Sequence, residues 1–291
     1  MPDNHWYRAT RAAGIVWTAL FASAVMTLVP GCTLPHAAMN RTDLQPFALP
    51  AADTGQRVEP AAAGRTQVLG QTRRGRSLTC VWLGDGPDRT LILSGVHGDE
   101  PQSTDVVRRL GEFLAARPAL LQGRQVVLFA AVNPDGLEKR IRKNAAGVDL
   151  NRNFPASNWK PSHPRGRYHG GPSPASEPET QAMMGIVQEF KPHKIIAVHA
   201  ISGGRECNNF DGPAEDLARQ MSGLNGYPVR PTIGYPTPGC LGSWAGAVRG
   251  IPTVTLELPA SAGGGPCWRA NRDALLAAIQ FRATPLASSI R

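Results

Sequence analysis

The chain has 291 residues with a formal net charge of +9, and hydrophobic residues make up 42% of it. This length suits one large domain or two small ones, and the apolar fraction is sufficient for a sizeable core. The sequence has no basic run with interleaved aromatic residues, so nucleic-acid binding is not expected. A scattered positive surface instead favours partners that carry carboxylates or another negative charge.

Residues 1–31 have the pattern of an export signal. Arg8 and Arg11 precede an apolar run over residues 12–29, which ends at Gly31-Cys32. This ending resembles a bacterial lipoprotein cleavage box, so we expect cleavage before Cys32, lipid on its thiol and a membrane anchor on the periplasmic side. Plain secretion and an uncleaved N-terminal anchor are the alternatives, because about 20 apolar residues can span a bilayer.

Residues 32–64 are rich in alanine and proline and predict a tether, which leaves residues 65–291 as the folded domain. Four cysteines follow the tether: Cys80, Cys207, Cys240 and Cys267. Four thiols in an exported protein are expected to form disulfides, with three possible connectivities. The alternative is that some of them are small buried residues.

Predicted strands and helices alternate along this domain. Two short apolar runs, residues 66–69 and 78–83, predict an opening hairpin. Further strands are expected at residues 90–94, 125–132, 194–198 and 253–258. Helices are expected around Leu110–Leu114, from a capping box at Ser176–Glu179 to Phe190, and over residues 241–248 and 268–282. Asn133–Gly136 predicts a turn, and a long irregular segment continues to about residue 175.

This alternation predicts an α/β fold: a single domain with a mixed, mostly parallel sheet covered by helices on both faces. In such sheets ligands bind beyond the carboxyl ends of the strands. His97, Asn133 and His199 each follow or end a predicted strand. We therefore expect these separate motifs to meet at one edge of the sheet.

The side chains at that edge are of the types that bind zinc. His97 and Glu100 lie three residues apart on one turn, and His199 provides a distant third ligand. Three histidine or glutamate ligands leave a fourth position for water, as in catalytic zinc sites, although the His/Glu pair alone is weak evidence. Glu257 lies between Leu256 and Leu258 and is a candidate proton acceptor. The alternative for Glu257 is a structural carboxylate paired with arginine.

Four stretches together resemble the zinc carboxypeptidase family: residues 96–100, 133–136, 147–154 and 255–257. They occur in the family's order, and the resemblance covers about residues 65–285. It implies that His97, Glu100 and His199 hold one zinc ion and that Glu257 is the general base and acid.

Further roles follow from the same resemblance. It implies that Arg142 stabilises the oxyanion, Asn151 and Arg152 bind the substrate's terminal carboxylate, Tyr235 covers the substrate, and Asp149 hydrogen-bonds a zinc-bound histidine.

The resemblance therefore implies a zinc-dependent hydrolase that removes a C-terminal residue from a peptide with a free C-terminal carboxylate. Three further stretches, residues 151–155, 176–181 and 234–239, resemble family members that act on cell-wall peptides. We therefore expect a murein peptide cleaved at a γ-D-glutamyl–diaminopimelate bond. The alternatives are a general carboxypeptidase of L-peptides, a deacylase of N-acyl amino acids and a wall-binding protein without activity. Residues 200–204 depart from the expected pattern beside the substrate.

Overall fold

The computed structural model describes residues 64–282. The predicted signal peptide, the lipid attachment at Cys32 and nearly all of the predicted tether lie outside the described residues. Within the described part of the chain, no helix has the length and apolar character needed to cross a membrane.

The framework of the domain is one eight-stranded sheet in the order β1-β2-β4-β3-β5-β8-β6-β7. The strands are β1 (Arg65–Gln71), β2 (Ser77–Gly84), β3 (Asp88–Ser94), β4 (Arg124–Phe129), β5 (Lys194–Ile201), β6 (Cys207–Asp211), β7 (Val229–Arg230) and β8 (Thr253–Pro259). The four central strands, β4, β3, β5 and β8, are parallel to one another. Antiparallel pairs join β1 to β2, β2 to β4 and β6 to β8. The sheet is therefore mixed with a parallel centre, as predicted.

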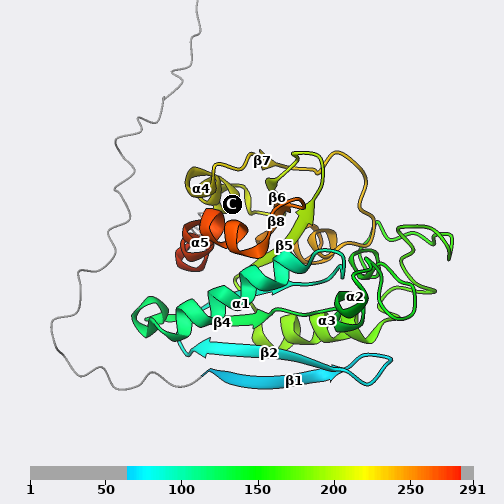
Figure 1. Ribbon diagram of the computed structural model, residues 1–291, viewed down its shortest axis with the longest axis horizontal. Helices are drawn as coiled ribbons and strands as arrows, with labels where there is room; N and C mark the ends of the chain where they lie inside the picture. The colour runs from blue at the N-terminus through cyan, green and yellow to red at the C-terminus, as the bar shows by residue number, and fades with distance from the viewer. Residues whose placement is uncertain (1–63, 283–291) are drawn as a thin grey trace, which may run out of the picture. The chain divides into compact units, whose positions relative to one another are not determined.

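Helices cover both faces of this sheet (Figure 1). The helices are α1 (Pro101–Ala115), α2 (Pro134–Lys139), α3 (Pro178–Phe190), α4 (Glu215–Asn225) and α5 (Gly264–Gln280), with shorter helical turns at Pro118–Leu121, Leu150–Arg152 and Gly242–Ala247. One core cluster packs α1, α4 and α5 against the sheet. A second cluster packs α3 and the π-helical turn at Gly242–Ala247 against the opposite face. The fold class expected from the alternating pattern is therefore confirmed.

Side chains alternate between the two faces of the sheet along each strand, and this alternation places His199 and Glu257 on the same face. On β5, Ile196 and Val198 point into the first cluster, whereas Ile195 and Ala197 point into the second. Since successive strand residues alternate between faces, His199 continues the second row beyond its apolar part. Glu257 pairs with His199 in the parallel register of β5 and β8, so the two side chains project from the same face.

Two local predictions are wrong. Asn133–Gly136 does not form an isolated turn; Asn133 caps α2, where its side-chain oxygen accepts a hydrogen bond from the Gly136 N–H at 2.9 Å. The capping box at Ser176–Glu179 is also absent. Glu177 is the residue that precedes α3, and no side chain caps the helix. Glu179 is instead fully buried, and its side chain accepts a hydrogen bond from Asn144 at 3.1 Å.

The expected disulfides are also absent from the described residues, where Cys80, Cys207, Cys240 and Cys267 are all free and buried. Cys80 and Cys267 belong to the two core clusters on opposite faces of the sheet, so the sheet separates them. Cys240 lies beside Ser243, with its Sγ 3.3 Å from the Ser243 hydroxyl. All four therefore fill the role of small buried side chains.

Candidate active site

The turn after β3 holds its shape through internal hydrogen bonds. Gly95 has a φ of +63°, a left-handed conformation that favours glycine. The buried Ser103 hydroxyl accepts a hydrogen bond from the Gly95 N–H at 3.3 Å and donates one to the Glu100 carbonyl at 2.7 Å. A side chain on Gly98 would lie 2.0 Å from the Gly136 carbonyl carbon, so this turn packs directly against α2. The backbone around His97 and Glu100 is thereby fixed on two sides.

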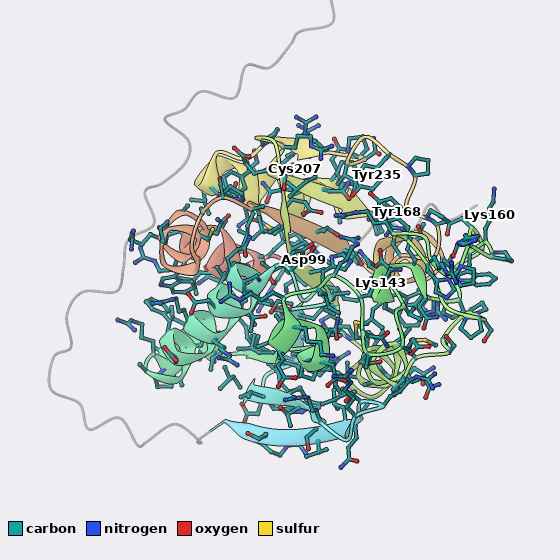
Figure 2. All side chains as sticks on the ribbon, turned by 45° about the vertical axis from the view of Figure 1, so that its right-hand side comes forward. Asp99, Lys143, Lys160, Tyr168, Cys207 and Tyr235 are labelled. Carbon is teal, nitrogen blue, oxygen red and sulfur yellow. The ribbon has the colours of Figure 1, made fainter. Side chains whose placement is uncertain are left out.

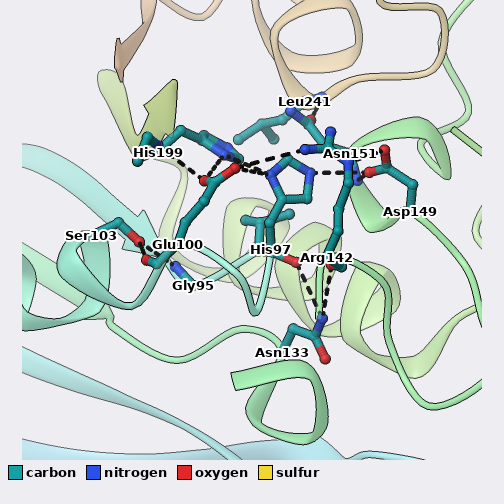
Figure 3. A network of polar contacts seen from close by, with 12 residues as sticks. Gly95, His97, Glu100, Ser103, Asn133, Arg142, Asp149, Asn151, His199 and Leu241 are labelled. Atoms are coloured by element: carbon teal, nitrogen blue, oxygen red, sulfur yellow. Dashed lines mark hydrogen bonds and ion pairs between the residues drawn. The ribbon is translucent and has the colours of Figure 1, made fainter. Parts of the chain in front are cut away.

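The three predicted metal ligands converge (Figure 3). The Nδ1 atom of His97 lies 2.7 Å from Oε1 of Glu100, and Nδ1 of His199 lies 3.0 Å from Oε2 of the same carboxylate. The two Nδ1 atoms are 3.2 Å apart. All three side chains are buried, with exposed fractions of 3%, 7% and 3%. One candidate ligand atom from each residue lies within 4.8 Å of the other two.

This donor set fits zinc. Ligands at 2.0–2.2 Å in a tetrahedral zinc site are separated from one another by about 3.4 Å. The observed separations of 2.7–3.2 Å between the nitrogen and oxygen atoms are close to that spacing. Two ring nitrogens that face each other at 3.2 Å, with a carboxylate between them, are also the arrangement expected around a cation. Three protein ligands leave one further position for water or substrate.

Asp149 and Arg142 extend the ligand cluster on the side of His97. Oδ1 of the fully buried Asp149 lies 3.0 Å from Nε2 of His97, and its Oδ2 accepts a hydrogen bond from Nε of Arg142 at 2.9 Å. Burial alone lowers the pKa of His97, but the carboxylates of Glu100 and Asp149 outweigh it and raise this pKa to about 9. Burial raises the pKa of Asp149, but His97 and Arg142 more than offset that effect and hold it well below its usual range. Asp149 therefore orients the imidazole of His97.

Glu257 faces this cluster from the neighbouring strand. Its Cα pairs with that of His199, and its side chain is 93% buried. Burial raises the pKa of the Glu257 carboxyl, an effect that the positive charges of the nearby His199, His97 and Arg142 oppose and that Glu100 reinforces. No salt bridge to Glu257 is present within residues 64–282, so the alternative of an arginine-paired structural carboxylate is not supported.

Asn151 and Arg152 follow Asp149 on the short turn at Leu150–Arg152. The Asn151 side-chain oxygen accepts a hydrogen bond from the Leu241 N–H at 2.9 Å, which ties this turn to the π-helical turn. The guanidinium of Arg152 donates to the Asn151 carbonyl at 2.6 Å and is otherwise free of ion pairs with residues 64–282. Both predicted substrate-binding residues are therefore held by backbone contacts beside Asp149.

Tyr235 stacks on Tyr168, with the ring centroids 6.1 Å apart. Tyr168 was missed by the sequence analysis, because nothing in the irregular segment around it distinguishes one aromatic residue. The guanidinium groups of Arg142 and Arg152 lie 5.5 and 5.1 Å from its ring centroid. Tyr168 therefore connects three of the predicted site residues, although 43% of its surface is exposed.

Residues 200–204, which include the end of β5 and depart from the expected pattern, contribute a contact that the sequence did not indicate. The Ala200 N–H donates to Oε2 of Glu100 at 3.0 Å, the same oxygen that faces His199. The nine predicted site residues are thus brought together on one face at the carboxyl ends of the central strands.

Known proteins resemble this chain in sequence and in fold. Residues 59–212 match the family model described as zinc carboxypeptidase. Murein peptide amidase A from Escherichia coli (strain K12) is 36% identical over 180 residues, which cover 58% of this chain and 70% of that protein. Murein peptide amidase A from Vibrio campbellii is 32% identical over 183 residues, or 59% of this chain and 69% of that one.

Among solved structures, murein-tripeptide amidase from Escherichia coli O157 aligns with a TM-score of 0.61 and 28% identity. The alignment covers 75% of this chain and 93% of that one. The family match and the shared fold together identify the chain as a hydrolase that belongs to the zinc carboxypeptidase family.

Proposed function

We propose that this protein is a zinc-dependent murein peptide hydrolase that removes a C-terminal diaminopimelate residue from a γ-D-glutamyl linkage. The observation that carries the proposal is the convergence of His97, Glu100 and His199 beside Glu257, with Arg152, which forms no salt bridge within residues 64–282, lining the adjoining cavity. His97, Glu100 and His199 would hold one zinc ion, which, when bound, polarises a carbonyl and acidifies water.

Glu257 accepts the proton of the attacking water in this proposal and passes it to the leaving nitrogen. Its position opposite His199 places it next to the ligand cluster, and its raised pKa brings the carboxyl closer to the pH at which a general acid and base works best. Because no salt bridge holds it within residues 64–282, the carboxylate is free to exchange a proton. Glutamine at this position would fill the same space without that capacity.

Arg142 stabilises the negative charge that develops on the carbonyl oxygen. Its Nη1 lies 3.7 Å from Oε1 of Glu100, so the guanidinium borders the metal ligands, while its Nε is held by Asp149. A donor fixed before the reaction loses no free energy to reorganisation when charge develops. Asp149 therefore orients both His97 and Arg142.

Asn151 and Arg152 bind the terminal carboxylate of the substrate, and Tyr235 closes over it. A guanidinium can bind a carboxylate through two parallel hydrogen bonds. Arg152 has no carboxylate partner among residues 64–282 and is buried beside the ring of Tyr168, so it is a cation available for a ligand. Tyr235 is partly buried and stacked on the same ring. The site thus recognises a free C-terminus.

The names of the relatives support murein as the substrate class. Two murein peptide amidases at 36% and 32% identity and a murein-tripeptide amidase of the same fold are similar to this chain. The tripeptide that ends in diaminopimelate, incubated with the zinc-loaded protein and compared with an unblocked L-peptide, tests the proposal through the identified products. Release of diaminopimelate from the tripeptide supports it, whereas cleavage of the L-peptide alone would assign a general carboxypeptidase.

We also propose that the protein is exported and anchored through lipid on Cys32. The support is the Arg8 and Arg11 start, the apolar run and the Gly31-Cys32 ending. Mass spectrometry of the mature N-terminus in a bacterial host tests it. Lipid on Cys32 is the expected result, and an intact Met1 or an unmodified Cys32 would contradict the anchor.

A further inference from the structure

Beside Arg152 the site continues into a cavity of about 280 Å³. Its walls come from two segments far apart in the chain. One contributes Arg152, Lys160 and Tyr168, and the other contributes Pro236 and Pro238. This volume is slightly below the range of pockets that hold drug-sized ligands, so it suits a single amino-acid residue rather than a longer peptide. Because Arg152 lines the cavity, the residue in it would be the one whose carboxylate Arg152 holds.

The two loop segments that wall this cavity carry only positive charges. Residues 155–176 contain Lys160, Arg165 and Arg167 but no aspartate or glutamate. Residues 231–256, which provide the opposite wall, contain one cation, Arg249, and likewise no acidic residue. Of these cations only Lys160 joins Arg152 in lining the cavity. In Figure 2, Tyr168 and Tyr235 lie beside each other, and Lys160 lies further out on the same side.

Neither lining cation is held in an ion pair by the described part of the protein, although the charge of Arg152 helps to lower the pKa of the nearby Asp149. Within residues 64–282, Arg152 and Lys160 form no salt bridge, in contrast to Arg142, whose Nε is bound to Asp149. Two cations in one cavity without a carboxylate repel each other and attract an anion. A ligand with two carboxylates would neutralise both.

We propose that Lys160 selects substrates whose C-terminal residue carries a second carboxylate on its side chain. Arg152 holds the α-carboxylate and Lys160 the side-chain carboxylate, while Tyr168 and the prolines form the apolar walls between them. A lysine suits this role because its ammonium is a point charge on a flexible stem that can follow side chains of different length. This inference rests on the proposed function, since it assumes that Arg152 holds the terminal carboxylate.

Peptides that end in glutamate or glutamine test the selection, because the two differ only in side-chain charge. The zinc-loaded enzyme should hydrolyse the glutamate peptide with a kcat/KM about tenfold higher, as expected for a charge-assisted hydrogen bond to the ammonium of Lys160. Lys160→Met, which keeps length and removes charge, should bring this ratio near one, mainly by lowering kcat/KM for the glutamate peptide. Arg165→Met is the matched control, because Arg165 lies in the same segment but does not line the cavity, and it should preserve the ratio.

A binding measurement distinguishes an error in the role of Lys160 from an error in the proposed hydrolase activity. Calorimetry with glutarate and its monoamide, glutaramate, measures the same charge difference without a peptide bond. Glutarate should bind the wild type about tenfold more tightly, and Lys160→Met should abolish the difference. If no peptide is hydrolysed but this binding preference is present, the proposed function fails and the cavity assignment stands. If peptides are hydrolysed with equal kcat/KM and glutarate has no advantage, or if Arg165→Met acts like Lys160→Met, Lys160 is not the selecting residue.

Discussion

The metal-binding side and the substrate-binding side of this site are built in different ways. His97, Glu100 and His199 lie at or just beyond the ends of central parallel strands and are buried. Lys160, Tyr168 and Tyr235 come from long segments without regular structure and are exposed or only partly buried. Hydrogen bonds connect every member of the first group to another member, whereas ring stacking is the main contact within the second.

This difference indicates which part of the fold determines the chemical step and which part determines substrate specificity. Ligand atoms must stay within a few tenths of an ångström of their metal positions, which requires a rigid and buried framework. Recognition of one side chain can be changed by substitutions on a loop without disturbing the sheet. We therefore expect substitutions on the metal side to affect the chemical step or the metal, and those on the substrate side to change preference among substrates.

The largest effect is expected for Glu257→Gln. The amide keeps the shape of the side chain but cannot accept a proton, so kcat should fall by about 10²–10⁴-fold or more while zinc content is unchanged. In the metal-free protein the free energy of unfolding should not decrease. Burial raises the folded-state pKa of Glu257 above its unfolded value, so the ionised carboxylate destabilises the fold at neutral pH, and the uncharged amide removes that penalty. Turnover near the wild-type rate would contradict the role of Glu257.

Loss of a metal ligand comes next. His199→Ala leaves only His97 and Glu100 of the three ligands, so zinc should dissociate and activity should fall with it. Metal analysis after dialysis against a chelator is the measurement. His193→Ala is the control, because His193 is half-exposed and lies beside Asp88, at the start of β3, rather than in the cluster. Equal zinc content in the two variants would remove His199 from the site.

On the substrate side, Arg152→Ala should change the preference between substrates more than the rate of the chemical step. Without the guanidinium, a peptide with a free C-terminal carboxylate loses its charged partner, whereas the same peptide with a C-terminal amide loses little. The kcat/KM for the free acid should fall by about a hundredfold, the upper range for a charge-assisted hydrogen bond, with zinc retained. If both peptides lose activity equally, Arg152 does not read the terminal carboxylate.

The same contrast explains what the sequence could predict. The central strands, the sheet class and the convergence of His97, Glu100 and His199 were predictable, because apolar strands place their carboxyl ends at one edge. Strands β6 and β7 and helix α4 were not predicted, because the strands have only 5 and 2 residues and the helix has few apolar residues, so neither pattern stands out. Tyr168 could not be identified, since its role depends on the path of a loop without periodicity. Disulfides were expected among the four cysteines because a cysteine count contains no information on the layer of the fold in which each thiol lies.

The smallest effects concern the hydrogen bonds that shape each side, and two serines allow a direct comparison. Ser103 is fully buried, and its hydroxyl connects the Gly95 N–H with the Glu100 carbonyl. Ser162 is exposed, and its hydroxyl accepts a hydrogen bond from the Gly170 N–H at 2.9 Å beside the substrate cavity. Ser103→Ala leaves a buried donor without a partner, so the free energy of unfolding should decrease by about 1–3 kcal/mol. Ser162→Ala should change it by less than about 0.5 kcal/mol, because water can replace the hydroxyl at an exposed site. Urea denaturation of the metal-free proteins measures both values, and equal destabilisation would show that the substrate-side segments are as rigid as the turn that carries the metal ligands.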